Sequence, residues 1–155
     1  MICYKIFMDF NKKQTKKKDK AILICMEKQE TLTPNMLFIL NILLENEKPI
    51  SAYDISAIIK KRGKNLNISS VYRDIEFWVR LNVIHKISYL KKYMLCDNTD
   101  ERHTHITNVC TSCMSVIETC NESMGLDLME SSKKLGVLLS PDINIEIPII
   151  CENCQ

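Results

Sequence analysis

The sequence contains no hydrophobic run long enough to cross a membrane. A spanning helix needs roughly 18 or more apolar residues in succession, and no stretch of this 155-residue chain approaches that length. The apolar opening is interrupted by Asp9, and lysines follow where a secretory signal would carry its small-residue cleavage site. These absences argue against a membrane or secreted protein, and we expect a cytoplasmic one.

A strong bias in composition is also missing. Hydrophobic residues make up 46% of the chain and charged residues 26%, which are values typical of globular proteins. Wholesale disorder and fibrous folds are therefore excluded. A chain of this length forms one ordinary domain or two small ones and buries roughly 70% of its unfolded surface, so it needs no disulfides.

The small net charge of +2 conceals two halves of opposite sign. Residues 1–97 hold 18 Lys and Arg against 10 Asp and Glu, whereas residues 98–155 hold 3 against 9. A basic half attracts polyanions such as nucleic acids, and an acidic half does not. A solvated, lysine-rich surface without any ligand would show the same asymmetry, so charge alone does not establish DNA binding.

Four of the eight cysteines form two Cys-x-x-Cys pairs, Cys110 with Cys113 and Cys151 with Cys154. Disulfides are disfavoured in a reducing cytoplasm. A redox role would need a thioredoxin-like βαβ context, which neither pair has. Each pair can offer two thiolates to one edge of a tetrahedral Zn²⁺ ion. The spacing therefore predicts one structural zinc that joins segments distant in the sequence.

Capping residues and apolar spacing predict a helical N-terminal half. Residues 1–20 show no apolar periodicity and are interpreted as a basic mobile tail, with a short helix from 21 to about 30. Thr33 followed by proline predicts the start of a helix of about three turns. Ser51 caps a second helix, and a third is expected over residues 69–81.

A β-hairpin is predicted directly after the third helix, because residues 83–89 and 93–96 alternate between apolar and polar. Three helices and a hairpin over residues 21–97 indicate a winged helix-turn-helix, whose third helix enters the DNA major groove. Arg can donate two hydrogen bonds to guanine, and Tyr can pack on a thymine methyl group. A solvated helix face is the alternative for these side chains. The candidate DNA-binding residues are Ser70, Tyr72 and Arg73 on the helix and Lys91 and Lys92 at the wing tip.

The remaining residues predict a hinge over 98–105 and a small α/β domain over 106–155. Strands are expected at 106–109, 116–118 and 143–149, with a helix over 121–135 that turns Met124, Leu128 and Leu135 inward. Pro148 places the last strand at a sheet edge or end. Fewer than 60 residues cannot bury this apolar surface alone, so zinc and a partner subunit are expected to help. The overall fold class is α+β.

Taken in order, the segments TPNMLFIL, SAYDISAIIKKRG, SSVYRDIEFWVRLNVIHKI, YMLC, HTH, CTSC and CENC carry a family resemblance. Over residues 20–154 the chain resembles the ferric uptake regulator family of bacterial metal-sensing repressors, and is most similar to its zinc uptake regulator branch. The resemblance implies a homodimer with an operator-binding winged helix and a C-terminal α/β dimerisation domain.

The resemblance also implies two zinc ions per subunit. The family's structural site maps onto Cys110, Cys113, Cys151 and Cys154, and the zinc branch's regulatory site onto His85, Cys96, His103 and Glu118. Two imidazoles, a thiolate and a carboxylate make a tetrahedral set suited to Zn²⁺. Taken singly, His85 is as readily a packed strand residue and Cys96 a small buried apolar one. His105 remains an alternative to His103.

The function implied is a zinc-responsive repressor of metal uptake genes. An iron- or manganese-sensing member of the same family is one alternative, and a zinc-ribbon interaction module without DNA binding is another. A catalytic zinc would need an open coordination position and a nearby acid or base, and only Glu118 could serve, so no enzyme is expected. The chain departs from the family in carrying Met114 where Gly usually follows the second Cys, and the turn is expected to avoid a glycine conformation.

Overall fold

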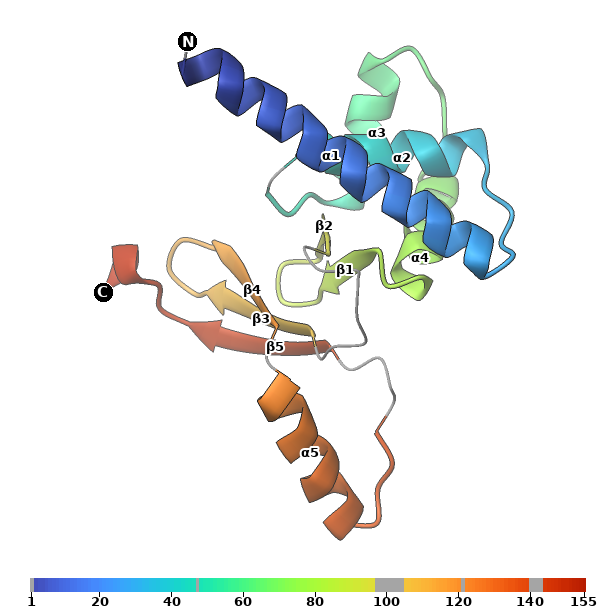
Figure 1. The fold of residues 1–155 in the computed structure, drawn as a ribbon. Coiled ribbons are helices and arrows are strands. Elements are labelled where there is room, and N and C mark those ends of the chain that lie inside the picture. The colour runs from blue at the N-terminus through green and yellow to red at the C-terminus, as the bar shows by residue number, and fades with distance from the viewer. Residues whose placement is uncertain (1, 47, 97–104, 121, 140–143) are drawn as a thin grey trace.

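The computed structural model describes residues 2–46, 48–96, 105–120, 122–139 and 144–155. Four helices and a hairpin form one end of the molecule, and a three-stranded sheet with a fifth helix forms the other end, with the hairpin lying between the four helices and the sheet (Figure 1). This arrangement confirms the predicted α+β class. The elements are α1 Ile2–Glu27, α2 Pro34–Glu45, α3 Ala52–Lys61, α4 Ile68–Arg80, β1 Ile84–Ile87, β2 Lys92–Leu95, β3 His105–Cys110, β4 Val116–Cys120, α5 Glu122–Lys134, β5 Asn144–Ile149 and the 3₁₀ turn η1 Glu152–Cys154.

Side-chain caps fix where the helices of the winged-helix half begin. The Thr33 hydroxyl accepts a hydrogen bond from the Met36 N–H, and Ser51 forms a reciprocal capping box with Asp54. Both predicted starts are therefore confirmed. Helix α4 begins one residue earlier than expected, because Asn67 caps it by accepting from the Ser70 N–H at 2.7 Å.

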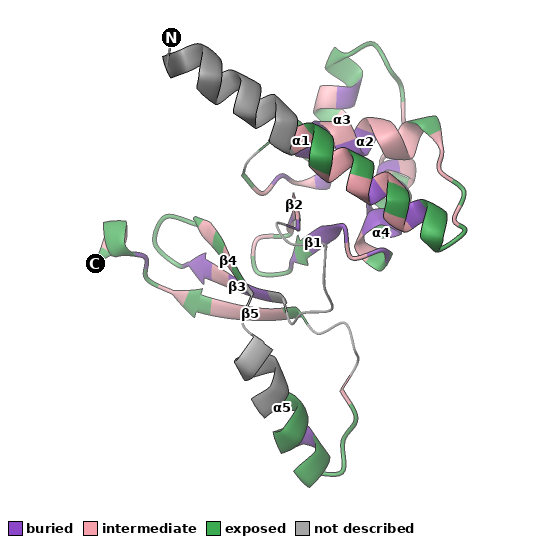
Figure 2. Ribbon diagram, viewed as in Figure 1, coloured by how far each residue is buried: buried purple, intermediate pink, exposed green. Residues whose placement is uncertain are grey.

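A single apolar core holds α4 against α2 and α3. Trp78 on α4 is fully buried, and its indole N–H donates to the Met36 carbonyl oxygen on α2 at 2.9 Å. Burial follows one stripe of α4 and leaves the opposite stripe to solvent (Figure 2). The core therefore fixes which face of α4 can reach a partner. Its largest fully buried members include Ile39, Leu40, Ile42, Ile55, Ile59, Val71, Ile75 and Trp78.

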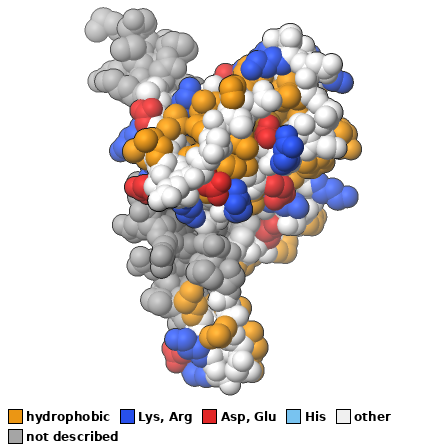
Figure 3. Space-filling model, turned by 90° about the vertical axis from the view of Figure 1, so that its right-hand side faces the viewer, with side chains coloured by type: hydrophobic (Ala, Val, Ile, Leu, Met, Phe, Trp, Pro, Cys, Tyr) orange, Lys and Arg blue, Asp and Glu red, His pale blue; other side chains and the backbone are white. Residues whose placement is uncertain are grey.

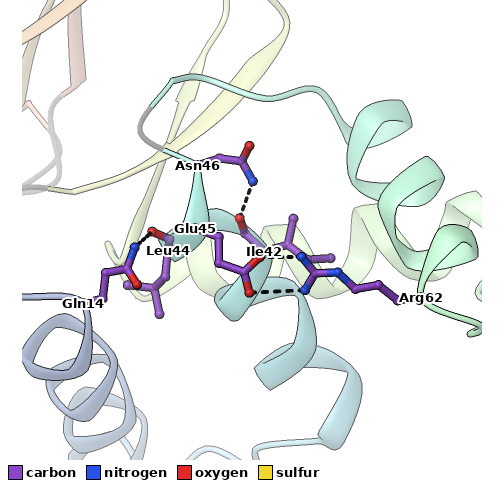
Figure 4. Close-up of polar contacts among 6 residues, drawn as sticks. All are labelled: Gln14, Ile42, Leu44, Glu45, Asn46 and Arg62. Atoms are coloured by element: carbon purple, nitrogen blue, oxygen red, sulfur yellow. Dashed lines mark hydrogen bonds and ion pairs between the residues drawn. The ribbon is translucent and has the colours of Figure 1, made fainter. Parts of the chain in front are cut away.

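The first helix differs from the prediction. Residues 1–20 were expected to form a mobile tail, whereas α1 continues without a break from Ile2 to Glu27. No Gly or Pro occurs before Pro34, and Lys and Gln are good helix formers. The Gln14 amide donates to the Leu44 carbonyl oxygen at 2.7 Å, next to the ion pair of Glu45 with Arg62 (Figure 4). The predicted secondary structure of this segment is wrong, because tertiary contact with α2 adds to its helix propensity.

The C-terminal sheet has the strand order β4-β3-β5. Strand β3 pairs antiparallel with β4 and parallel with β5, so β5 is an edge strand, as Pro148 predicts. The predicted hinge falls almost wholly outside the described residues. Within the described parts of the chain, no helix is both long and apolar enough to cross a bilayer.

Helix α5 does not turn its predicted apolar face inward. Leu128 is 37% exposed and Leu135 is 80% exposed, and the side chain of Met124 lies outside the described residues. The helix extends away from the sheet (Figure 1), and the described part of the chain leaves Leu128 and Leu135 exposed. The exposed apolar side chains continue beyond the helix at Val137 and Leu138.

Candidate metal centres and DNA-binding surface

The two Cys-x-x-Cys pairs meet at one end of the C-terminal sheet. Cys110 ends β3 and Cys151 follows β5, and the parallel register pairs Cys110 with Ile149. All four sulfur atoms lie within 4.8 Å of one another, and the sulfurs of Cys113 and Cys151 are 3.6 Å apart. Four sulfurs placed about 2.3 Å from one tetrahedral Zn²⁺ are separated by about 3.8 Å. The cluster is therefore suited to a zinc ion.

Hydrogen bonds around this cluster already favour thiolates at two of its positions. Backbone N–H groups of Cys113 and Cys151 lower the pKa of Cys110 to about 6. The Ser115 hydroxyl lowers the pKa of Cys113. The pKa of Cys154 rises to about 12, because its thiol shares hydrogen bonds with the thiols of Cys151 and Cys113. Metal coordination deprotonates a thiol outright, so this donor set fits a cation better than it fits four free thiols.

The turn that contains Cys110 and Cys113 corrects one expectation. Met114 adopts φ +59°, the left-handed conformation that glycine usually supplies, rather than avoiding it. Its N–H donates to the Cys110 carbonyl oxygen at 2.9 Å, and the Cys110 N–H donates to Ser115 at 2.9 Å. Closing this tight turn therefore takes precedence over the intrinsic backbone preference of methionine.

A second cluster lies between the three-stranded sheet and the β1–β2 hairpin, which forms the wing. His85 comes from β1, Cys96 follows β2 and Glu118 comes from β4, and their ligand atoms lie within 4.8 Å of one another. The His85 Nε2 atom is 3.1 Å from Glu118 Oε1, and the Cys96 sulfur is 3.6 Å from the same oxygen. The side chains of His85 and Glu118 are only 5% and 2% exposed. Three of the four predicted regulatory residues are thus brought together.

The fourth predicted ligand is not tested. His103 lies outside the described residues, and His105 begins β3 with a side chain that is also not described. One further polar group next to the cluster has no partner among the described residues. Thr107 pairs with Glu118 across β3 and β4 and is fully buried, and its hydroxyl has no hydrogen-bond partner within the described chain. An imidazole, a thiolate and a carboxylate beside an unsatisfied hydroxyl fit a zinc ion and its second shell.

The predicted DNA-reading residues lie on the free face of α4 and on the wing. Tyr72 is 38% exposed, and the Arg73 side chain is 77% exposed, while Ser70 is half-buried near the N-terminus of the helix. At the wing turn, Lys91 is exposed at φ +52° and Lys92 is half-buried. Figure 3 shows Lys and Arg side chains interspersed with acidic and apolar ones over the helical end of the molecule. Tyr72, Arg73 and Lys91 are thus the exposed members of the predicted set.

Two acidic residues near these surfaces were missed in the sequence. Asp74 on α4 is buried, and burial raises the pKa of its carboxyl group, although Arg73 at 3.8 Å opposes the shift. Its spacing with Val71 and Trp78 on the apolar stripe could have identified it. Glu146 on β5 bonds to the wing turn. No local pattern signals that contact, because it joins segments almost sixty residues apart.

The chain is similar in sequence and in structure to known regulators. The model of the ferric uptake regulator family matches residues 27–146. The zinc uptake regulation protein of Escherichia coli (strain K12) is 29% identical over 137 residues, which cover 87% of this chain and 79% of that protein. The ferric uptake regulation protein of Bacillus subtilis (strain 168) is 29% identical over 127 residues, covering 80% and 85%. The solved structure of a zinc uptake regulator complexed with zinc and DNA superposes with a TM-score of 0.80 at 26% identity, covering 91% of this chain and 94% of that one.

Proposed function

Because the chain belongs to the ferric uptake regulator family, whose members are transcription regulators and not enzymes, we propose that it is a dimeric zinc-responsive repressor. It binds operator DNA when its regulatory site is filled and controls metal uptake genes. The observation that carries the proposal is the meeting of His85, Cys96 and Glu118 between the wing and the sheet. A ligand held by all three ties the DNA-binding half to the dimerisation half.

The proposal assigns one structural and one regulatory Zn²⁺ to each subunit. The structural ion is held by Cys110, Cys113, Cys151 and Cys154, and the regulatory ion by His85, Cys96, His103 and Glu118. Zinc is favoured over iron and manganese because a buried thiolate in the regulatory set is a soft ligand. The similarity to a regulator solved with zinc and DNA supports the same choice.

The exposed apolar side chains of α5 and the segment after it support a homodimer. Leu135, Val137 and Leu138 are all at least half exposed in the single chain. Apolar surface of this kind, on a domain too small to bury it, is typical of a subunit interface. In a dimer with two-fold symmetry, the two α4 helices then face successive half-sites of an operator.

Sensing follows from where the regulatory ligands reside. His85 belongs to the wing and Cys96 directly follows it, whereas Glu118 belongs to the sheet. Ligation by all of them favours one orientation of the wing relative to the sheet, to the extent that the filled site is more stable in that orientation. The orientation sets the separation of the two α4 helices in the dimer, so occupancy of the site changes operator affinity.

Gel-shift titration with promoter DNA, with and without a chelator, tests the proposal. We expect binding with zinc and its loss when a chelator empties the regulatory site. Failure to bind any promoter DNA at any metal concentration would favour the zinc-ribbon interaction module. Metal analysis of the protein purified from its own host separates a zinc sensor from an iron or manganese sensor.

A further inference from the structure

The edge strand β5 contacts the wing through groups that belong to neither metal cluster. The Glu146 carboxylate accepts two backbone hydrogen bonds from the wing turn, from the Ser88 N–H at 2.6 Å and from the Tyr89 N–H at 3.0 Å. On the same strand, the Asn144 amide donates to the Lys86 carbonyl oxygen at 3.3 Å. Side chains of β5 thus bind backbone groups of the wing, independently of the wing's side chains.

The sheet register explains how one hairpin is held at two points. Thr107 on the central strand pairs with Glu118 on one side and with Glu146 on the other. Directly paired residues point to the same face of a sheet. The two carboxylates therefore flank Thr107 in one row facing the wing. Glu118 reaches His85 within β1, and Glu146 reaches the turn that follows β1.

Two separated attachments restrict the hairpin more than one does. A wing held only at His85 and Cys96 could pivot about that point, whereas the bonds to Ser88 and Tyr89 also fix the turn. Lys91, the predicted phosphate contact, lies in the same turn, and its N–H donates to the Ser88 carbonyl oxygen at 3.2 Å. Hydrogen bonds therefore connect Glu146 to the turn that carries Lys91.

We propose that Glu146 is a positioning residue that latches the wing turn to the dimerisation sheet and thereby sets the zinc concentration at which operator is bound. The inference rests on the proposed function and deepens it. Charge-assisted hydrogen bonds to a carboxylate are stronger than neutral ones. They stabilise the orientation in which His85 and Cys96 face Glu118. The apparent zinc affinity falls in proportion to any loss of that orientation.

Three variants at one position separate the geometry of the latch from its charge. Glu146→Ala removes both bonds, Glu146→Asp keeps the charge but shortens the reach, and Glu146→Gln keeps the reach but leaves only one oxygen to accept. Glu130→Gln is the matched control, because Glu130 is an exposed residue on α5 that pairs with Lys134. Purified dimers are titrated with buffered zinc in the presence of operator DNA.

We expect Glu146→Ala and Glu146→Asp to raise the zinc concentration for half-maximal operator binding about tenfold, equivalent to about 1.4 kcal/mol. Glu146→Gln should fall in between, and Glu130→Gln should match the wild type. The direction of the shift in zinc concentration distinguishes loss of the latch from a simple charge effect. Removing a negative charge near DNA without any latch would strengthen binding. A Glu146→Ala curve that overlays the wild type, or shifts to lower zinc, overturns the latch.

Amide hydrogen exchange at Ser88 and Tyr89 gives a readout that does not depend on DNA. The latch predicts faster exchange of these two amides in Glu146→Ala, with unchanged exchange in α4 and a full four-cysteine site. Unchanged exchange at both amides contradicts it. If the wild type shows no zinc-dependent operator binding, the proposed function fails, and exchange alone decides whether the contact holds the wing.

Discussion

Replacing Glu118 with glutamine removes one anionic oxygen from the regulatory cluster and changes its shape very little. The carboxylate is 2% exposed, and one of its oxygens lies 3.1 Å from His85 Nε2 and 3.6 Å from the Cys96 sulfur. Glutamine can still form a hydrogen bond with the imidazole. The substitution therefore tests the negative charge of Glu118 and its role as a metal ligand, while the packing of the side chain is kept.

Two magnitudes follow from this geometry. A hydrogen bond to a charged group contributes about 1.5–3 kcal/mol and a neutral one about 0.5–1.5, so Glu118→Gln should lower the free energy of unfolding of the protein with an empty regulatory site by about 1 kcal/mol. Loss of a second-shell partner alone costs about 10–100-fold in metal affinity. Loss of a direct ligand should cost at least about 100-fold, or about 2.7 kcal/mol.

Competition with a chelator of known zinc affinity measures the loss of zinc affinity. Urea unfolding of the chelator-treated protein measures the change in the free energy of unfolding. The four-cysteine site should remain full throughout, because Glu118 lies away from it. Glu130→Gln, which removes an exposed carboxylate that is 69% accessible, is the charge control. If Glu118→Gln binds its second zinc within about threefold of the wild type, the carboxylate is not a ligand and the regulatory assignment fails.

Four further changes test other parts of the account. Cys113→Ser should lose one tightly held zinc and destabilise the dimerisation domain, because metal binding is coupled to folding; a dimer with unchanged zinc content would refute the structural site. Arg73→Ala should cost about 1–3 kcal/mol of specific operator binding and relax base preference at full zinc content. Changing Lys91 and Lys92 should instead weaken binding to all sequences and reduce the salt dependence by roughly 0.9 log units per lost phosphate contact. Because burial raises the pKa of Asp74, the folded state binds its proton more tightly than the unfolded state, and stability falls as the pH rises through that pKa. Asp74→Asn should therefore raise the melting temperature at pH 7 and lose this advantage near the ordinary Asp pKa of about 3.9; an equal gain at both pH values would contradict this explanation.

Local chemistry made much of the fold predictable. The Thr33 and Ser51 caps act within three residues of themselves, so the helix starts can be read without knowing the tertiary structure. The alternation after residue 82 likewise marks the hairpin that carries His85. The two cysteine pairs are local motifs too, and their spacing was enough to predict that they share one ion.

Contacts between distant segments account for the errors. Helix α1 is continuous where a tail was expected, since its bond to Leu44 comes from another helix. The amphipathic spacing of Leu128 and Leu135 predicts that these side chains are covered, but it does not predict whether the same chain or a partner subunit covers them. Glu146 looks like an ordinary solvent-facing strand residue until the register places it opposite the wing.

We expect occupancy of the cluster of His85, Cys96 and Glu118 to control operator binding. Zinc titration of operator binding by Cys96→Ser, compared with the wild type at a full four-cysteine site, tests it most directly. Serine removes the soft thiolate, so the variant should stay dimeric, bind operator weakly at zinc concentrations that saturate the wild type, and recover partly in excess zinc because its other ligands remain. A Cys96→Ser curve that overlays the wild-type curve would contradict the account.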